Sequence, residues 1–246
     1  MDLKGKVVVI TGATGGIGSC ITKEFDKEGA NLILISRDLL KLKYLLKKLK
    51  GKGHKIFACD FNEDVKTCKI IENICDSFDK IDILINCAGT GVYKNLEDVE
   101  LADWESSINV NVSAPFMLIR GLIEILKKAE KALVFNIGSG MGKIPTAGRS
   151  VYCASKFALR GLSMSLSEEF RNTNVSFIHI DLGSTLTGFG PVPLEEKIDQ
   201  NLRGKAYFTP DWVAKKIIEI IKNDDIKDEI TLYPSEYDGG CSLEGA

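Results

Sequence analysis

A tyrosine and a lysine four residues apart are the first side chains that could act together chemically. They are Tyr152 and Lys156, in the segment Tyr-Cys-Ala-Ser-Lys. Residues at this spacing lie on one face of a helix, so the ammonium would lie near the phenol. A free tyrosine has a pKa of about 10, and a neighbouring cation lowers it by stabilising the phenolate. The pair predicts a tyrosine acid–base group, with a chance pairing on an exposed helix as the alternative.

A serine follows a predicted strand upstream of this pair. Ser139 comes directly after the apolar run Leu133–Ile137 and is flanked by Gly138 and Gly140. In parallel α/β sheets, ligands bind at the carboxyl ends of the strands. Ser139 is therefore placed to hydrogen-bond a substrate oxygen, although the glycines could mark only a turn.

A glycine-rich turn lies near the start of the chain, where Thr11–Gly18 reads Thr-Gly-Ala-Thr-Gly-Gly-Ile-Gly. A predicted strand precedes it and a predicted helix follows it. Glycines here allow a tight turn and let backbone amides approach a phosphate at the helix N-terminus. The context favours dinucleotide binding, although the spacing differs from the common G-x-G-x-x-G pattern.

Short apolar runs alternate with amphipathic helical segments along the chain. Continuous apolar runs are typical of strands that are covered on both faces. The alternation predicts an α/β fold, with a parallel sheet of about seven strands and helices on both faces. The predicted strands are Val7–Ile10, Leu32–Ile35, Ile56–Ala58, Ile81–Ile85, Leu133–Ile137, Val175–Ile180 and Ile230–Leu232. The predicted helices are Ile17–Glu28, Leu39–Leu49, Val65–Phe78, Trp104–Lys128, one from Tyr152 to about Asn172, and one capped by Thr209.

The 246 residues contain no internal repeat and no linker, so we expect a single domain over residues 1–246. One segment, 185–207, interrupts the alternation with glycines and prolines. Such a segment is typical of a substrate lid or of a long surface loop.

Composition excludes several classes of protein. Hydrophobic residues make up 44% and charged residues 27%, and the formal net charge is −2. These values indicate a globular protein and give no support for nucleic-acid or membrane binding. The seven cysteines, Cys241 included, are irregularly spaced and the chain has only two histidines, so no metal site is expected. Free thiols and the lack of a signal-length apolar segment predict a cytoplasmic protein.

Taken together, these motifs resemble the short-chain dehydrogenase/reductase family, in its shorter single-domain subgroup, from about Lys6 to Leu232. The resemblance implies a Rossmann-type doubly wound sheet. Two positions depart from the family pattern, because Cys87 replaces an asparagine and Leu182 replaces a proline. The matching segments are Thr11–Gly18, Asp60 with Phe61, Asn86-Cys87-Ala88-Gly89, Asn111, Ser139, Tyr152, Lys156, and Leu182-Gly183-Ser184-Thr185-Leu186-Thr187.

The resemblance also implies roles for these residues. Tyr152 would exchange a proton with the substrate oxygen, and Ser139 would hold that oxygen. Lys156 would lower the pKa of Tyr152 and bind the nicotinamide ribose, while Asn111 would fix a water that connects Lys156 to solvent. The implied cofactor contacts are Gly12, Thr14, Gly15, Gly16, Ile17, Gly18, Ser36, Arg37, Asp60, Phe61, Asn86, Ala88, Gly89, Tyr152, Lys156, Gly183, Thr185 and Thr187.

The choice of cofactor depends on the end of the second strand. Members of the family that prefer NAD carry an acidic residue there, which would repel a 2′-phosphate. This chain has Ser36 and Arg37 instead, and both suit a phosphate. Asp38 adjoins them, and a solvated loop arginine is the alternative. We therefore expect NADP(H) to be favoured over NAD(H).

The leading functional hypothesis is an NADP(H)-dependent oxidoreductase that interconverts a carbonyl and a secondary or primary alcohol. One alternative is a 3-oxoacyl-acyl-carrier-protein reductase, for which Lys127, Lys128 and Lys131 could supply a basic docking surface. Another is a non-catalytic NAD(P)-binding sensor, which the presence of both Tyr152 and Lys156 disfavours. Near the pocket mouth we expect Tyr93, Met141 and Ile144.

The two longest predicted helices carry more apolar side chains than one core-facing stripe requires. An exposed apolar patch predicts a homotetramer or homodimer, as relatives pair these helices, whereas two wide-faced core helices would fit a monomer. The residues concerned are Phe116, Leu118, Ile119, Leu122 and Ile123 on the first helix, and Phe157, Leu159, Leu162, Met164 and Leu166 on the second.

Overall fold

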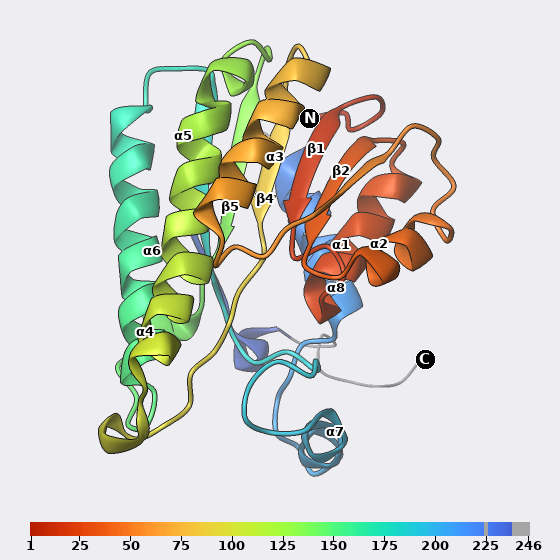
Figure 1. The fold of residues 1–246 in the computed structure, drawn as a ribbon. Coiled ribbons are helices and arrows are strands. Elements are labelled where there is room, and N and C mark those ends of the chain that lie inside the picture. Colours follow the sequence, from red (N-terminus) through yellow and green to blue (C-terminus); the bar gives the residue numbers. More distant parts are fainter. Residues whose placement is uncertain (224–225, 238–246) are drawn as a thin grey trace.

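Seven parallel strands form one sheet at the centre of the computed structural model, which describes residues 1–223 and 226–237 (Figure 1). The strand order is β3-β2-β1-β4-β5-β6-β7. The predicted fold class is confirmed. Cys241, which was counted among the free thiols, lies outside the described residues. The strands are β1 Val7–Thr11, β2 Asn31–Ser36, β3 Lys55–Ala58, β4 Ile83–Asn86, β5 Ala132–Ile137, β6 Val175–Leu182 and β7 Glu229–Leu232.

Helices cover both faces of this sheet (Figure 1). Successive strand residues point to opposite faces, so Val8 packs in one core cluster and Val9 in the other. Both clusters exclude water, which explains why the strands are continuously apolar rather than alternating. One face carries α1 (Gly16–Lys27), α2 (Leu39–Leu46) and α8 (Pro210–Lys222); the other carries α3 (Asp64–Ser77), α4 (Leu101–Ile108), α5 (Ala114–Leu126) and α6 (Ser150–Glu169).

The predicted helix Trp104–Lys128 differs from the structure. It begins at Leu101 and is divided by a π-helical turn, Asn109–Ser113, between α4 and α5. Pro115 follows the turn and has no N–H to donate to the carbonyl four residues earlier, so the regular helical ladder is interrupted there. The turn places Asn111 at the level of the strand ends.

Residues Leu101–Leu126 are together long and apolar enough to cross a membrane by length and composition alone. In the fold, however, Leu118 and Leu122 are buried against the sheet. Much of the apolar character of this helix is therefore explained by core packing.

The predicted apolar patch on the two long helices is smaller than expected. Several of its residues belong to the core, most of them on α5, whose apolar face packs against the sheet. The buried members are Leu118, Ile119, Leu122 and Leu159. Phe116 on α5 and Phe157 on α6 remain exposed, and Trp104 on α4, which contacts α6, is a third exposed ring.

The segment that follows β6 contains a helix of its own, α7 (Leu194–Leu202), which lies beyond the carboxyl edge of the sheet (Figure 1). A short bridge between Thr185 and Phe208 joins the two ends of the segment. The side chain of Lys197 is buried, and its ammonium donates to the carbonyl oxygens of Thr187 and Phe189. The two ends of the segment are therefore joined to each other, and Lys197 joins α7 to the residues that follow Thr185.

An ion-pair network fastens α6 and the loop after β5 to the edge strand. Glu229 on β7 accepts from Arg160 Nε at 2.6 Å and lies 3.1 Å from Lys143 Nζ. Lys143 also pairs with the buried Asp181 on β6 at 2.7 Å. The hydrogen bond from Arg160, together with Lys143, lowers the pKa of Glu229 to about 2.

The network predicts an acid-dependent contribution of Glu229 to stability. The native carboxylate stays ionised down to a pKa of about 2, whereas the unfolded one protonates near 4.5. The stabilisation is therefore complete above pH 4.5 and is lost as the pH falls toward 2. Glu229→Gln should cost about 1–3 kcal/mol at pH 7, measured by urea unfolding, and the difference from the parent should shrink at pH 3. Glu168→Gln, which removes an exposed carboxylate on α6, serves as the control and should change little. A cost that is independent of pH would contradict this account.

Candidate active site

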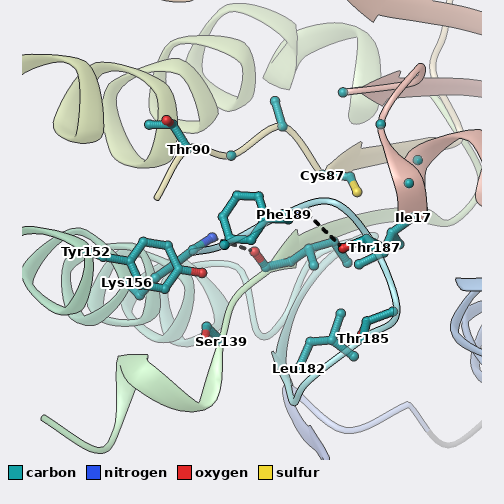
Figure 2. Close-up of a pocket in the computed structure, with 18 of the residues that line it drawn as sticks. Ile17, Cys87, Thr90, Ser139, Tyr152, Lys156, Leu182, Thr185, Thr187 and Phe189 are labelled. Atoms are coloured by element: carbon teal, nitrogen blue, oxygen red, sulfur yellow. Dashed lines mark hydrogen bonds between the residues drawn. The ribbon is translucent and has the colours of Figure 1, made fainter. Parts of the chain in front are cut away.

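A cavity of about 880 Å³ opens at the carboxyl ends of the strands. It spans the point between β1 and β4 where the strand order reverses, which is where open α/β sheets bind ligands. The residue that follows each of the seven strands lines it, namely Gly12, Arg37, Cys59, Cys87, Gly138, Gly183 and Tyr233. Figure 2 shows part of its wall.

Most of the residues singled out in the sequence line this one cavity. They are Gly12, Thr14, Gly15, Gly16, Ile17, Gly18, Ser36, Arg37, Phe61, Ala88, Gly89, Ser139, Tyr152, Lys156, Gly183, Thr185 and Thr187. Tyr93, Met141 and Ile144, which were expected near its mouth, line it as well.

The glycine-rich turn presses directly on the loop after β4. Gly12 has a φ of 63°, and a Cβ there would lie 2.8 Å from the Cα of Ala88. A Cβ on Gly18 would overlap the carbonyl oxygen of Gly12. Thr11 Oγ1 accepts hydrogen bonds from the backbone N–H groups of Cys87 and Ala88, each at 3.0 Å. Two strand ends are thus joined at van der Waals distance.

The first turn of α1 is suited to an anion. Its N-cap residue, Gly15, offers no side-chain cap, and the turn contains no acidic residue. The backbone of Gly15, Gly16 and Ile17 lines the cavity, so the positive end of the helix dipole faces it. Amides in this arrangement bind phosphate groups.

The end of β2 presents a hydroxyl and a guanidinium to the cavity. Ser36 shares a hydrogen bond with Thr14 in the glycine-rich turn, and Arg37 is exposed beside it. Asp38 is used elsewhere, since its carboxylate caps α2 by accepting from the N–H of Lys41 at 3.0 Å. Asp38 also lines the cavity beside Ser36 and Arg37.

Tyr152, Lys156 and Ser139 converge inside the cavity. Tyr152 and Lys156 lie on the face of α6 that packs over the loop after β5, and Ser139 is the first polar side chain of that loop. Figure 2 shows the Tyr152 hydroxyl pointing into the cavity on the side of Ser139. The Lys156 ammonium donates to the carbonyl oxygen of Ile137 at 3.0 Å.

The expected effect of Lys156 on Tyr152 is not seen in this structure. Burial raises the pKa of Tyr152, Tyr93 raises it further, and the hydrogen bond with Ser139 opposes the rise only in part. Burial also lowers the pKa of Lys156 to about 8. The physical reason is that both side chains are almost fully desolvated, while the ammonium points to a carbonyl oxygen rather than to the phenol.

Asn111 has a role in the architecture that the sequence did not predict. Its amide exchanges two hydrogen bonds with the backbone of Thr90, at 2.8 and 2.9 Å. Its Nδ2 also donates to Ser155 Oγ on α6 at 2.9 Å. Asn111 therefore ties the β4 loop to the helix that carries Tyr152 and Lys156, and it does not itself line the cavity.

Two further predicted contacts lie outside the cavity wall. The carboxylate of Asp60 accepts from the backbone and side chain of Asn62, which it holds in a tight turn. Asn86 is buried at the end of β4 and donates to Asn136 Oδ1 at 2.8 Å. Neither side chain is part of the cavity wall.

The far wall is built from aromatic side chains. Phe189 lies 6.0 Å from the ring of Tyr152 and 6.5 Å from that of Tyr93, between centroids. Its N–H donates to Thr187 Oγ1, so the aromatic wall continues into the threonine segment (Figure 2). Phe189 lies in a glycine- and proline-rich stretch without periodicity, and no sequence signal pointed to it.

Arg149 also lines the cavity and was not predicted. Its spacing of three residues before Tyr152 could have indicated that both share one side of α6. The three lysines considered for a carrier protein lie elsewhere. Lys127 and Lys128 follow the last turn of α5 and Lys131 directly precedes β5, so they lie at the amino edge of the sheet, opposite the cavity.

Comparison with known proteins gives a consistent result. The family described as short chain dehydrogenase matches residues 6–195. An uncharacterized oxidoreductase of Thermotoga maritima is 34% identical over 75% of this chain and 74% of its own. A 3-ketodihydrosphingosine reductase of Bos taurus is 31% identical over 89% and 69%. A 3-oxoacyl-acyl-carrier-protein reductase of Thermotoga maritima is 27% identical over 84% and 82%.

Solved structures agree in fold. A metagenomic short-chain oxidoreductase in complex with NADP is 28% identical, with a TM-score of 0.79 over 95% of this chain and 99% of that one. A 3-ketoacyl-acyl-carrier-protein reductase from Brucella melitensis complexed with NADH is 24% identical, with a TM-score of 0.83 over 94% and 98%. The chain is an oxidoreductase and belongs to the short-chain dehydrogenase family.

Proposed function

We propose that this oxidoreductase uses NADP(H) to interconvert a carbonyl and a secondary or primary alcohol, with Tyr152 as the acid–base group. One observation carries the proposal. The phenol of Tyr152, the hydroxyl of Ser139 and the ammonium of Lys156 line the same cavity as the glycine-rich turn. Hydride donor and proton donor would thus share one enclosed space.

The residues of the cavity fit a dinucleotide. Gly12 has no side chain and lies against Ala88, and the first turn of α1 has no side-chain cap. Together these features leave room for a pyrophosphate on that turn. Thr14, Ser36 and Arg37 would hold the adenosine end, and Thr185 with Thr187 the nicotinamide end. A bound nicotinamide supplies or accepts the hydride.

The acid–base step follows from the state of Tyr152. The phenol is protonated at neutral pH, as in any ordinary tyrosine, and can donate to a carbonyl oxygen that gains a hydride. Ser139 Oγ would donate a second hydrogen bond to the same oxygen. Lys156 Nζ lies 5.8 Å from the centre of the Tyr152 ring, and as a cation it would stabilise the phenolate that forms when the proton leaves. In the direction of alcohol oxidation the phenolate accepts the proton.

Residues 185–207 would serve as the substrate lid. The fastening of this segment through Lys197 to Thr187 and Phe189 supports this role, since one helix then controls both the aromatic wall and the threonine segment. A 3-oxoacyl-acyl-carrier-protein substrate is a second possibility, favoured by the relative from Thermotoga maritima. The lysines suggested for carrier docking do not support it, because they lie at the opposite edge of the sheet.

A homotetramer or homodimer is also part of the proposal. The rings of Trp104, Phe116 and Phe157, one on each of α4, α5 and α6, are exposed. Exposed aromatic side chains on neighbouring elements favour a self-complementary interface.

Tyr152→Phe should abolish nearly all turnover while cofactor binding is retained. The ring and its packing against Phe189 remain, and only the transferable proton is removed. We expect a loss of about 10²–10⁴-fold in kcat, measured with a panel of ketones and aldehydes, and unchanged NADPH affinity by fluorescence titration. Activity within a few-fold of the parent would remove Tyr152 from the mechanism.

Arg37→Ala should weaken the binding of NADPH far more than that of NADH. A charge-assisted contact to the 2′-phosphate contributes about ten- to a hundredfold in affinity. Both cofactors are titrated by the quenching of intrinsic fluorescence. Lys41→Ala, at a second cation that lines the same end of the cavity, tests whether any positive charge there has this effect. Equal losses for NADPH and NADH on Arg37→Ala would count against the assignment.

Light scattering after size exclusion should give two or four times the chain mass of 27.0 kDa. Replacing Phe116, which is 47% exposed, with serine should shift the population toward the monomer, because it removes an apolar ring from the interface. A parent protein that is monomeric at micromolar concentration would refute the oligomer.

A further inference from the structure

Arg149 lines the same cavity as Tyr152 and Ser139, but it has no role in the acid–base step proposed for them. Its guanidinium is half-buried and makes two contacts in the described chain. Nη1 lies 3.5 Å from the sulfur of Met141, and Cζ lies 5.3 Å from the ring centroid of Tyr93. Within residues 1–223 and 226–237, no carboxylate forms an ion pair with it. By contrast, Arg160 pairs with Glu229 and Arg171 with Glu168.

The position of Arg149 in the helix makes the lack of a carboxylate partner more destabilising. It is the N-cap residue of α6, a helix of twenty residues, and the positive end of the helix dipole disfavours a further cation there. The first turn of α6 has no acidic residue and no side-chain cap. A bound anion would compensate the guanidinium and the free amides of the helix together.

The guanidinium lies next to an aromatic ring that itself adjoins Tyr152. Arg149 stacks near Tyr93, whose ring lies 5.6 Å from that of Tyr152, so the three side chains form one continuous wall. Arg149 is also one helical turn before Tyr152. A group bound to Arg149 would therefore belong to the same molecule as an oxygen bound to Tyr152.

The surroundings indicate a single negative charge. The two buried cations of the wall already donate to carbonyl oxygens, Lys156 to that of Ile137 and Lys197 to two others. Lys205 is exposed. The one acidic residue on the described cavity wall, Asp38, lies at the opposite end and caps α2. One planar guanidinium that has no carboxylate partner among the described residues matches one carboxylate.

We infer that the substrate is an oxo acid or hydroxy acid and that Arg149 binds its carboxylate while Tyr152 and Ser139 bind the reacting oxygen. The inference rests on the proposed function and narrows its substrate class. The competing account is that Arg149 only supports the ring of Tyr93.

The first test compares matched acids and esters. Reduction of 3-oxobutanoate, 4-oxopentanoate and their methyl esters is followed with NADPH. The parent should prefer each acid over its ester. In Arg149→Gln, kcat/KM for the acids should fall by about ten- to a hundredfold more than for the esters. Arg171→Gln removes an arginine just beyond the other end of α6 and should keep the preference.

The second test does not depend on turnover. Binding of butanoate and of butanamide to the protein saturated with NADP⁺ is measured by calorimetry. Butanoate should bind the parent at least tenfold more tightly than butanamide, and Arg149→Gln should abolish the difference while its NADPH affinity is unchanged.

The outcomes separate the two proposals. Equal loss of acid and ester reduction in Arg149→Gln, or equal binding of butanoate and butanamide by the parent, would overturn the carboxylate site and leave a packing role. If the parent reduces nothing yet binds butanoate through Arg149, the anion site stands and the proposed function fails.

Discussion

The close contact between the β1–α1 turn and the loop after β4 is the constraint on which the site depends. Gly12 allows this contact because any side chain would overlap Ala88, and Thr11 secures it with two hydrogen bonds to the opposing backbone. The contact fixes the start of the β4 loop. Farther along that loop, Thr90 is held by Asn111, and Asn111 in turn reaches Ser155 on α6. A few hydrogen bonds thus connect the glycine-rich turn to α6, the helix that carries Tyr152.

This connection explains the π-helical turn between α4 and α5. A regular helix would rotate the side chains that follow it by a different amount, and functional sites often contain such single-turn π segments. Here the turn lets the amide of Asn111 exchange two bonds with one loop residue while it contacts α6. The distortion therefore lies at the one place where three elements must be joined by a single side chain.

The wall of the cavity carries mainly positively charged side chains, although the chain as a whole is nearly neutral. Lys156 and Lys197 are buried and Arg149 is half-buried on its wall. Burial lowers the pKa of both lysines, which is the cost of gathering cations away from water. Anionic groups of a cofactor and of a substrate would offset that cost. The net charge of −2 conceals this because the acidic residues lie largely on the surface or in ion pairs elsewhere.

The amino-acid sequence by itself determined the order of strands and helices, the parallel sheet, and the motifs that identify the family, because these depend on local periodicity and on spacings of a few residues. The structure was needed to show that Asn111 bridges two elements, that Leu118 and Leu122 belong to the core, and that Arg149 faces the cavity. It also showed that Tyr152 is buried, which raises its pKa. These features depend on contacts between residues far apart in the chain and on how completely each group is removed from water. Local sequence spacing carries no information on either, so only the packed tertiary structure decided them.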